Sequence, residues 1–166
     1  MLERILCHKD SPVPSTNENH PGVLSKVAGL FSRRGYNIES LVVSETEDSS
    51  ISRMTIVVEG DTRVLEQVGK QLNKLVDVIK VNDITDEETV ERQLCLIRVA
   101  TADQESRQEV LQITEVFRCH VVDIGRKTLI VEATGDEGKI QAIIRALKPF
   151  GITELVRTGK VAMLRG

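Results

Sequence analysis

The chain has 166 residues, of which 40% are apolar and 28% charged, and its formal net charge is −3 at neutral pH. This length suits one ordinary domain or two small ones, and this composition is typical of a folded protein. The small charge, the lack of a basic block, and an aromatic set of three Phe, one Tyr and no Trp exclude a nucleic-acid-binding surface.

The first segments of the chain predict a short strand followed by a helix. Leu2 to Cys7 forms an apolar run, and Pro21 and Gly35 supply helix start and stop signals. Between them, apolar residues recur three or four positions apart: Val23, Leu24, Val27, Leu30 and Phe31. Pro12 and Pro14 are unsuited to a central strand, so either the strand ends at Cys7 and a polar insertion follows, or the first strand is damaged.

The rest of the first half predicts two strands, a helix and a last strand. The strands are expected at Ile38 to Ser44, Ser52 to Glu59 and Val76 to Val81, and Asp61 is expected to cap the helix. The order is β-α-β-β-α-β, which is the ferredoxin-like arrangement.

The same order repeats after an acidic, aperiodic stretch at residues 84–91, which we interpret as a linker. We therefore predict an α+β chain of two tandem ferredoxin-like domains, residues 1–83 and 92–166. The second half has these expected elements: strands at Gln93 to Ala100, His120 to Ile124 and Thr128 to Ala133, helices around Ile113 and Ile143, and an extended segment from Ile152 to Leu164.

Three cysteines, Cys7, Cys95 and Cys119, are odd in number and far apart, which argues against a disulfide framework and for a reducing compartment. No apolar stretch approaches the roughly 20 residues that cross a bilayer, and the N-terminus resembles neither a signal nor a transit peptide. We expect no membrane contact and a cytoplasmic location, or the plastid stroma if the gene is plastid-encoded.

The sequence predicts no catalytic residues and no metal site. It has no glycine-rich phosphate loop and no nucleophile elbow. The dipeptides Cys7-His8 and Cys119-His120 fall on predicted strands, where adjacent side chains point to opposite faces and cannot chelate as a pair.

One constellation has the chemistry of an amino-acid site. Asn19, His20, Pro21 and Gly22 open the first helix, whose unpaired N–H groups and partial positive charge suit a carboxylate. Asn37 offers an amide that can meet an ammonium group. The alternative is that Asn19 caps the helix, Gly22 only packs, and Asn37 sits in a turn.

The run Arg-Gly-Tyr-Asn-Ile-Glu-Ser at residues 34–40 resembles the ACT domain of acetohydroxyacid synthase (acetolactate synthase) small subunits. Ser52 to Thr55, Glu115 to Arg118 and Arg157 to Ala162 resemble further runs of that family, and the similarity extends in register from Asn19 to the C-terminus.

The resemblance implies a regulatory subunit that is not itself an enzyme. Its partner would be a large catalytic subunit that uses thiamine diphosphate, Mg²⁺ and FAD, with no cofactor in this chain. The chain would form a homodimer through its ACT domains, and valine, binding where they meet, would inhibit branched-chain amino acid synthesis. The effector residues implied are Asn19, Pro21, Gly22, Val23, Leu24, Asn37 and Ile38.

Two rival functions are a stand-alone amino-acid-binding module that controls transcription or another enzyme, and a small ferredoxin-like enzyme. The first predicts a DNA-binding element and the second an acid or base in a cleft, and neither is visible in the sequence. Within a regulatory subunit, we expect residues 1–83 to suffice for contact with the large subunit and residues 92–166 to be needed for full activation.

Overall fold

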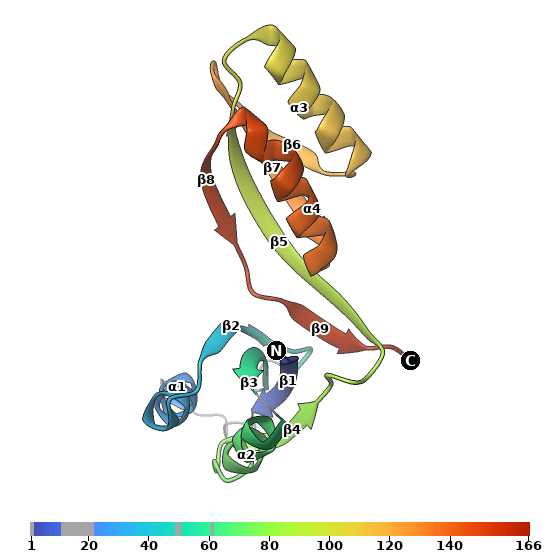
Figure 1. The fold of residues 1–166 in the computed structure, drawn as a ribbon. Coiled ribbons are helices and arrows are strands. Elements are labelled where there is room, and N and C mark those ends of the chain that lie inside the picture. Colours follow the sequence, from blue (N-terminus) through green and yellow to red (C-terminus); the bar gives the residue numbers. More distant parts are fainter. Residues whose placement is uncertain (1, 11–21, 49–50, 61) are drawn as a thin grey trace. The chain divides into compact units, whose positions relative to one another are not determined.

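The computed structural model describes residues 2–10, 22–48, 51–60 and 62–166, and among them the side chains of 2–10, 62 and 64 are left aside. The chain divides into two compact units, Met1–Val90 with Lys160–Gly166, and Glu91–Gly159. The elements of both units are labelled in Figure 1.

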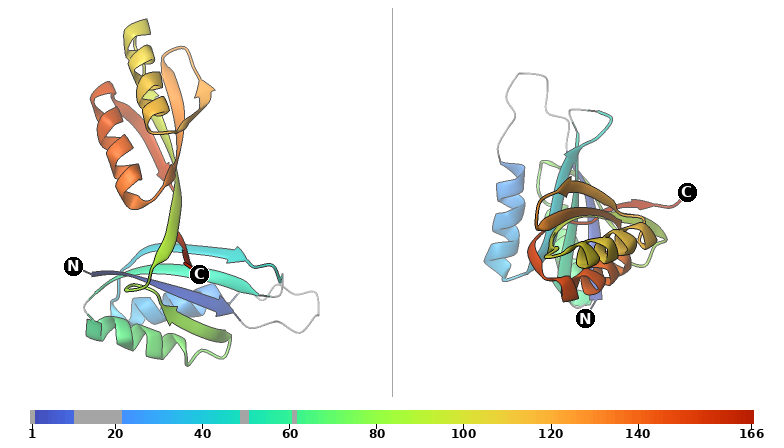
Figure 2. Two further views of the ribbon diagram at one scale, coloured as in Figure 1. Left: turned by 90° about the vertical axis from the view of Figure 1, so that its right-hand side faces the viewer. Right: turned by 90° about the horizontal axis from the view of Figure 1, so that it is seen from above.

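The first unit is a four-stranded antiparallel sheet with both helices on one face (Figure 2). Its strands lie in the order β2-β3-β1-β4, which is the ferredoxin-like order predicted from the sequence. The elements are β1 Leu2–Asp10, α1 Val23–Arg34, β2 Ile38–Glu45, β3 Ser52–Gly60, α2 Thr62–Leu72 and β4 Val78–Asp83.

The first strand is intact despite the prolines that follow it. β1 continues to Asp10 and pairs with both β3 and β4, so it is a central strand. Pro12 and Pro14 lie outside the described residues, as does Asp61, the predicted cap of α2.

Helix α1 follows the predicted apolar pattern. Val27, Leu30 and Phe31 are buried against the sheet, whereas Leu24, expected on the same face, is half-exposed. Gly35 ends the helix in the left-handed conformation, with φ 68°, where its backbone N–H donates to the Ser32 carbonyl.

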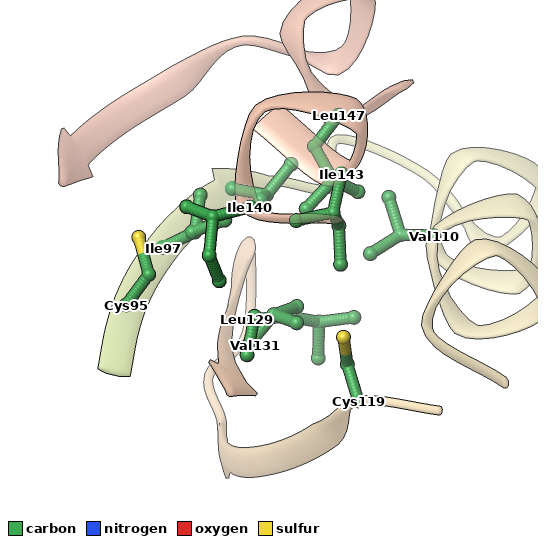
Figure 3. Close-up of a cluster of buried hydrophobic side chains, with 11 residues drawn as sticks. Cys95, Ile97, Val110, Cys119, Leu129, Val131, Ile140, Ile143 and Leu147 are labelled. Atoms are coloured by element: carbon green, nitrogen blue, oxygen red, sulfur yellow. The ribbon is translucent and has the colours of Figure 1, made fainter. Parts of the chain in front are cut away.

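The second unit repeats the same design. Its strand order is β6-β7-β5-β8, which places each strand as in the first sheet. The elements are β5 Thr89–Ala100, α3 Gln104–Val116, β6 His120–Ile124, β7 Thr128–Gly135, α4 Glu137–Leu147, a 3-10 turn Lys148–Phe150 and β8 Ile152–Arg157. Figure 3 shows its core, where Ile140 and Ile143 of α4 and Val110 of α3 meet Ile97, Leu129 and Val131 of the sheet.

Several predicted boundaries need correction. Val76, expected to start a strand, is 93% exposed in the turn before β4. The loop between β4 and β5 spans residues 84–88, so residues 89–91 of the predicted linker already belong to β5. Ile84 in that loop is buried, because apolar side chains cover it.

The predicted last extended segment is two strands. β8 ends at Arg157, and β9 Val161–Leu164 begins after a break at residues 158–160. Residues 160–166 belong to the first unit, where the buried side chain of Ala162 packs with Val57 and Ile84. The division of the chain into functional domains 1–83 and 92–166 stays a prediction.

Candidate functional site

Among the described residues, no side chain caps the start of α1. Gly22 is the N-cap residue, and it has no side chain to accept from the first turn. Its carbonyl accepts from the Lys26 backbone N–H at 2.8 Å, which begins the helical ladder. The exposed N–H groups of a first turn and the helix dipole form an anion site.

Gly22 does not serve packing among the described residues. A Cβ placed on it would meet no described atom within 4 Å. No described atom therefore stands in the way of a group that approaches the main chain at Gly22. Asn19 and Pro21 lie outside the described residues.

The helices of the second unit begin differently. The Asp103 carboxylate accepts from the Ser106 backbone N–H at 2.8 Å in a complete capping box, and Asp136 accepts from Lys139 N–H at 2.8 Å. The Ser106 N–H is the main reason that the pKa of the Asp103 carboxyl lies below its ordinary value. Each of these two helix starts already holds an anion from its own chain.

Asn37 and Ile38 lie at the other end of α1. Asn37 is exposed after the helix-ending Gly35, and Ile38 opens β2 and packs partly on the core. Helix α1 has 12 residues, which corresponds to a length of about 18 Å. One chain therefore does not bring Asn37 to the start of α1, although the sequence pattern groups these residues together.

The reactive groups in the described part of the chain offer no second site. Burial raises the pKa of the Cys95 and Cys119 thiols, which keeps them protonated and poorly nucleophilic. Cys119 is buried while the adjacent His120 is exposed, so this dipeptide does not chelate as a pair. Within the described ranges, no group of three His, Cys, Asp or Glu side chains could hold a metal ion. None of the described helices has the length and apolar character to cross a bilayer.

Sequence reasoning missed a polar cluster in the second unit. Gln93 lies on β5 in line with the core residues Cys95 and Ile97, yet it is polar and only 3% exposed. It hydrogen-bonds to Glu137 and Arg157. The sequence did contain a signal. Alternate residues of a strand share a face, so Gln93 was expected on the buried face, where a polar side chain needs hydrogen-bond partners.

Family models match most of the chain. Residues 15–80 match the model described as the AHAS small subunit-like ACT domain, and residues 92–166 match the model described as the small subunit of acetolactate synthase.

Curated relatives are similar over nearly the whole chain. A probable acetolactate synthase small subunit of Archaeoglobus fulgidus is 60% identical over 149 residues, covering 90% of this chain and 92% of that one. The acetolactate synthase small subunit of Aquifex aeolicus is 56% identical over 147 residues, covering 89% and 77%.

A solved structure has the same fold throughout. The crystal structure of the acetolactate synthase small subunit from Thermotoga maritima superposes with a TM-score of 0.85 at 39% identity, covering 100% of this chain and 99% of that one.

Proposed function

This chain belongs to the family of acetolactate synthase small subunits, and we propose that it is a regulatory subunit that activates a large catalytic subunit and makes it sensitive to valine. The observation that carries the effector part of the proposal is the start of α1 at Gly22, where no described side chain accepts from the first turn. The acetolactate chemistry, with thiamine diphosphate, Mg²⁺ and FAD, would belong to the large subunit.

We propose that the effector site forms between two copies of the chain. The carboxylate of valine binds at Gly22 of one copy, and its ammonium group meets Asn37 of the other. The length of α1, about 18 Å, supports this arrangement because it keeps the two groups apart within one chain.

Edge strand β2 is suited to join the two copies. It lies at the edge of its sheet and has eight residues, with a register shift only between Ile38 and Ser40. The corresponding edge strand β6 has only five residues and is interrupted between Val121 and Asp123. Both edges have one register shift, so their length separates them: the longer edge offers more backbone groups to a second strand.

Antiparallel pairing of two β2 strands would bring the proposed groups together. Only residues 35–37 connect α1 to β2, so the chain reverses direction there. The start of α1 therefore lies at the same end of the sheet as the end of β2. In an antiparallel pair, the C-terminal end of one β2 lies beside the N-terminal end of the other. Gly22 of one copy and Asn37 of its partner then lie at the same level.

Mixing two defective variants tests this site directly. Gly22→Asp and Asn37→Ala each damage one half of both sites in a homodimer, so each variant alone should bind valine weakly. After random exchange, half of the dimers are mixed, and each mixed dimer regains one intact site, so about a quarter of the sites should bind valine with the original affinity.

The two variants are unfolded together and refolded to exchange their subunits. Calorimetric titration with valine then measures the fraction of intact sites. Gly69→Asp and Asn73→Ala are matched controls, because Gly69 is an open helix glycine and Asn73 follows α2 as Asn37 follows α1. Absence of rescue in the mixture would contradict a site shared between two chains.

The regulatory role is tested with the purified large subunit. Addition of this chain should raise acetolactate synthesis, and valine should lower it again. A chain that co-purifies with no thiamine-dependent subunit, and that leaves the activity of that subunit unchanged, would refute the proposal.

A further inference from the structure

The terminal segment, residues 157–165, includes a family-like run to which the proposed function gives no role. It begins as the last residue of β8 and ends beyond β9. The second unit ends at Gly159, and Lys160 already belongs to the first unit. The segment is thus a second covalent connection between the units, in addition to the one that enters β5.

Its first residues are fixed in the second unit by hydrogen bonds. Arg157 Nη2 donates to Gln93 Oε1 at 2.6 Å and to Glu137 Oε2 at 2.7 Å. Gln93 Nε2 donates to the same Glu137 oxygen at 2.7 Å. Thr158 and Leu94 exchange two further bonds, because each backbone N–H donates to an oxygen of the other at 3.0 Å.

This anchor depends on Arg157. The buried Gln93 amide needs both of its polar atoms satisfied, and Arg157 is the donor to its oxygen. The other Glu137 oxygen accepts from Gln141 at 2.8 Å, which ties the cluster to the first turn of α4. Loss of the guanidinium therefore weakens the hold of the segment on β5 and α4 together.

The far end of the segment is fixed in the first unit. Ala162 is 6% exposed and packs with Val57 and Ile84, which are 1% and 3% exposed. The Arg165 backbone N–H donates to the Glu88 carbonyl at 2.8 Å. Val57 of β3 is paired with Ser40 of β2, two residues after Ile38 of the proposed effector site.

We propose that the terminal segment couples the two units, so that a change in one alters the stability of the other. Arg157 attaches the segment to the second unit, and Ala162 packs into the first unit. Only three residues separate Thr158 from Ala162, so fewer than about 15 Å of chain connect the two attachment points. The role of this coupling in valine inhibition rests on the proposed function, whereas the coupling itself does not.

Hydrogen exchange on the full chain tests the coupling without any effector. Arg157→Met should speed amide exchange about tenfold in β3 of the first unit, because a released segment seats Ala162 less firmly. Insertion of two glycines between Gly159 and Lys160 should confine the effect of Arg157→Met to the second unit. Arg98→Met is the matched control, because it removes an exposed ion pair with Glu154 between the same two strands, β5 and β8.

Unchanged exchange in β3 for Arg157→Met, or an equal effect with and without the inserted glycines, would overturn the coupling. In the complex with the large subunit, the glycine insertion should leave valine affinity within about twofold and reduce the maximal inhibition. An unmodified chain that neither activates nor binds valine refutes the proposed function instead, while the exchange result still decides the coupling.

Discussion

The two units share one strand order and one helix arrangement, yet they differ at the start of their helices. In the first unit, α1 begins at Gly22 without a side-chain acceptor. In the second unit, α3 and α4 begin at Asp103 and Asp136, whose carboxylates accept from their own first turns. At α3 or α4 a ligand anion would have to displace a carboxylate, whereas at α1 no described side chain stands in its place.

This difference shows how one fold can carry two roles. The sheet and the helices determine where a helix start lies, and a single residue at that start decides whether it can bind an anion. This difference supports the proposal that the effector binds to the first unit, since the starts of α3 and α4 already hold a carboxylate of their own chain.

The largest expected effect is on stability. It comes from a substitution in the core of the second unit, which should contribute to folding but not to valine binding. Ile143 is fully buried in the core of the second unit, and Ile143→Ala should lower the free energy of unfolding by about 2–5 kcal/mol. Valine affinity at 25 °C should be unchanged, because the proposed effector residues lie in the first unit. Urea unfolding and calorimetry measure both quantities. A tenfold loss of affinity in a folded variant would contradict the division of roles.

Gly22→Asp should separate stability from binding. An acidic N-cap suits the helix start, so the melting temperature should stay constant or rise slightly. Valine should bind about ten- to a hundredfold more weakly, because the new carboxylate occupies the donors that the ligand needs. Calorimetry and thermal unfolding of the same preparation give the two numbers, and equal losses in Gly69→Asp would show that the effect is not local.

Asp136→Ala should have the opposite pattern. It removes the acceptor for the Lys139 N–H at the start of α4, and loss of such a cap costs about 1 kcal/mol. Urea unfolding should show this loss, while valine affinity stays unchanged. A stability equal to that of the unmodified chain would mean that the cap contributes nothing.

The smallest effect is the pH dependence of the cap at Asp103. Its pKa in the folded chain lies below the ordinary 3.8, so the ionised cap stabilises the fold above that value. This contribution is lost as the pH falls through the folded pKa. Asp103→Asn keeps an acceptor that does not titrate. The stability difference between the two proteins should therefore shrink as the pH is lowered below about 4. A difference independent of pH would show that ionisation of Asp103 is unimportant.

Local patterns in the sequence predicted most of the architecture. The order β-α-β-β-α-β was confirmed twice, because apolar periodicity and the stop at Gly35 act within a few residues of chain. Boundaries were less well predicted. The exposed Val76 and the early start of β5 at Thr89 reflect tertiary pairing, which extends or shortens a strand beyond what its own residues favour.

The candidate site was predicted as a set of residues but not as an arrangement. Gly22 and Asn37 are 15 positions apart in the sequence, and the same helical pattern that identifies α1 places them at its opposite ends. Their roles remain predictions, and the separation of the two residues by the length of α1 is the reason that we propose a site shared between two chains.

The sequence by itself determined the family and the two repeated units, because these depend on residue types and on their near neighbours. The tertiary structure alone decided that residues 160–166 return to the first unit, that Ala162 covers Val57, and that Gln93 obtains its partners from Arg157 and Glu137. Those contacts join residues from 44 to more than 100 positions apart, and no local periodicity encodes which uncovered apolar surface or unpaired buried amide a distant segment will satisfy.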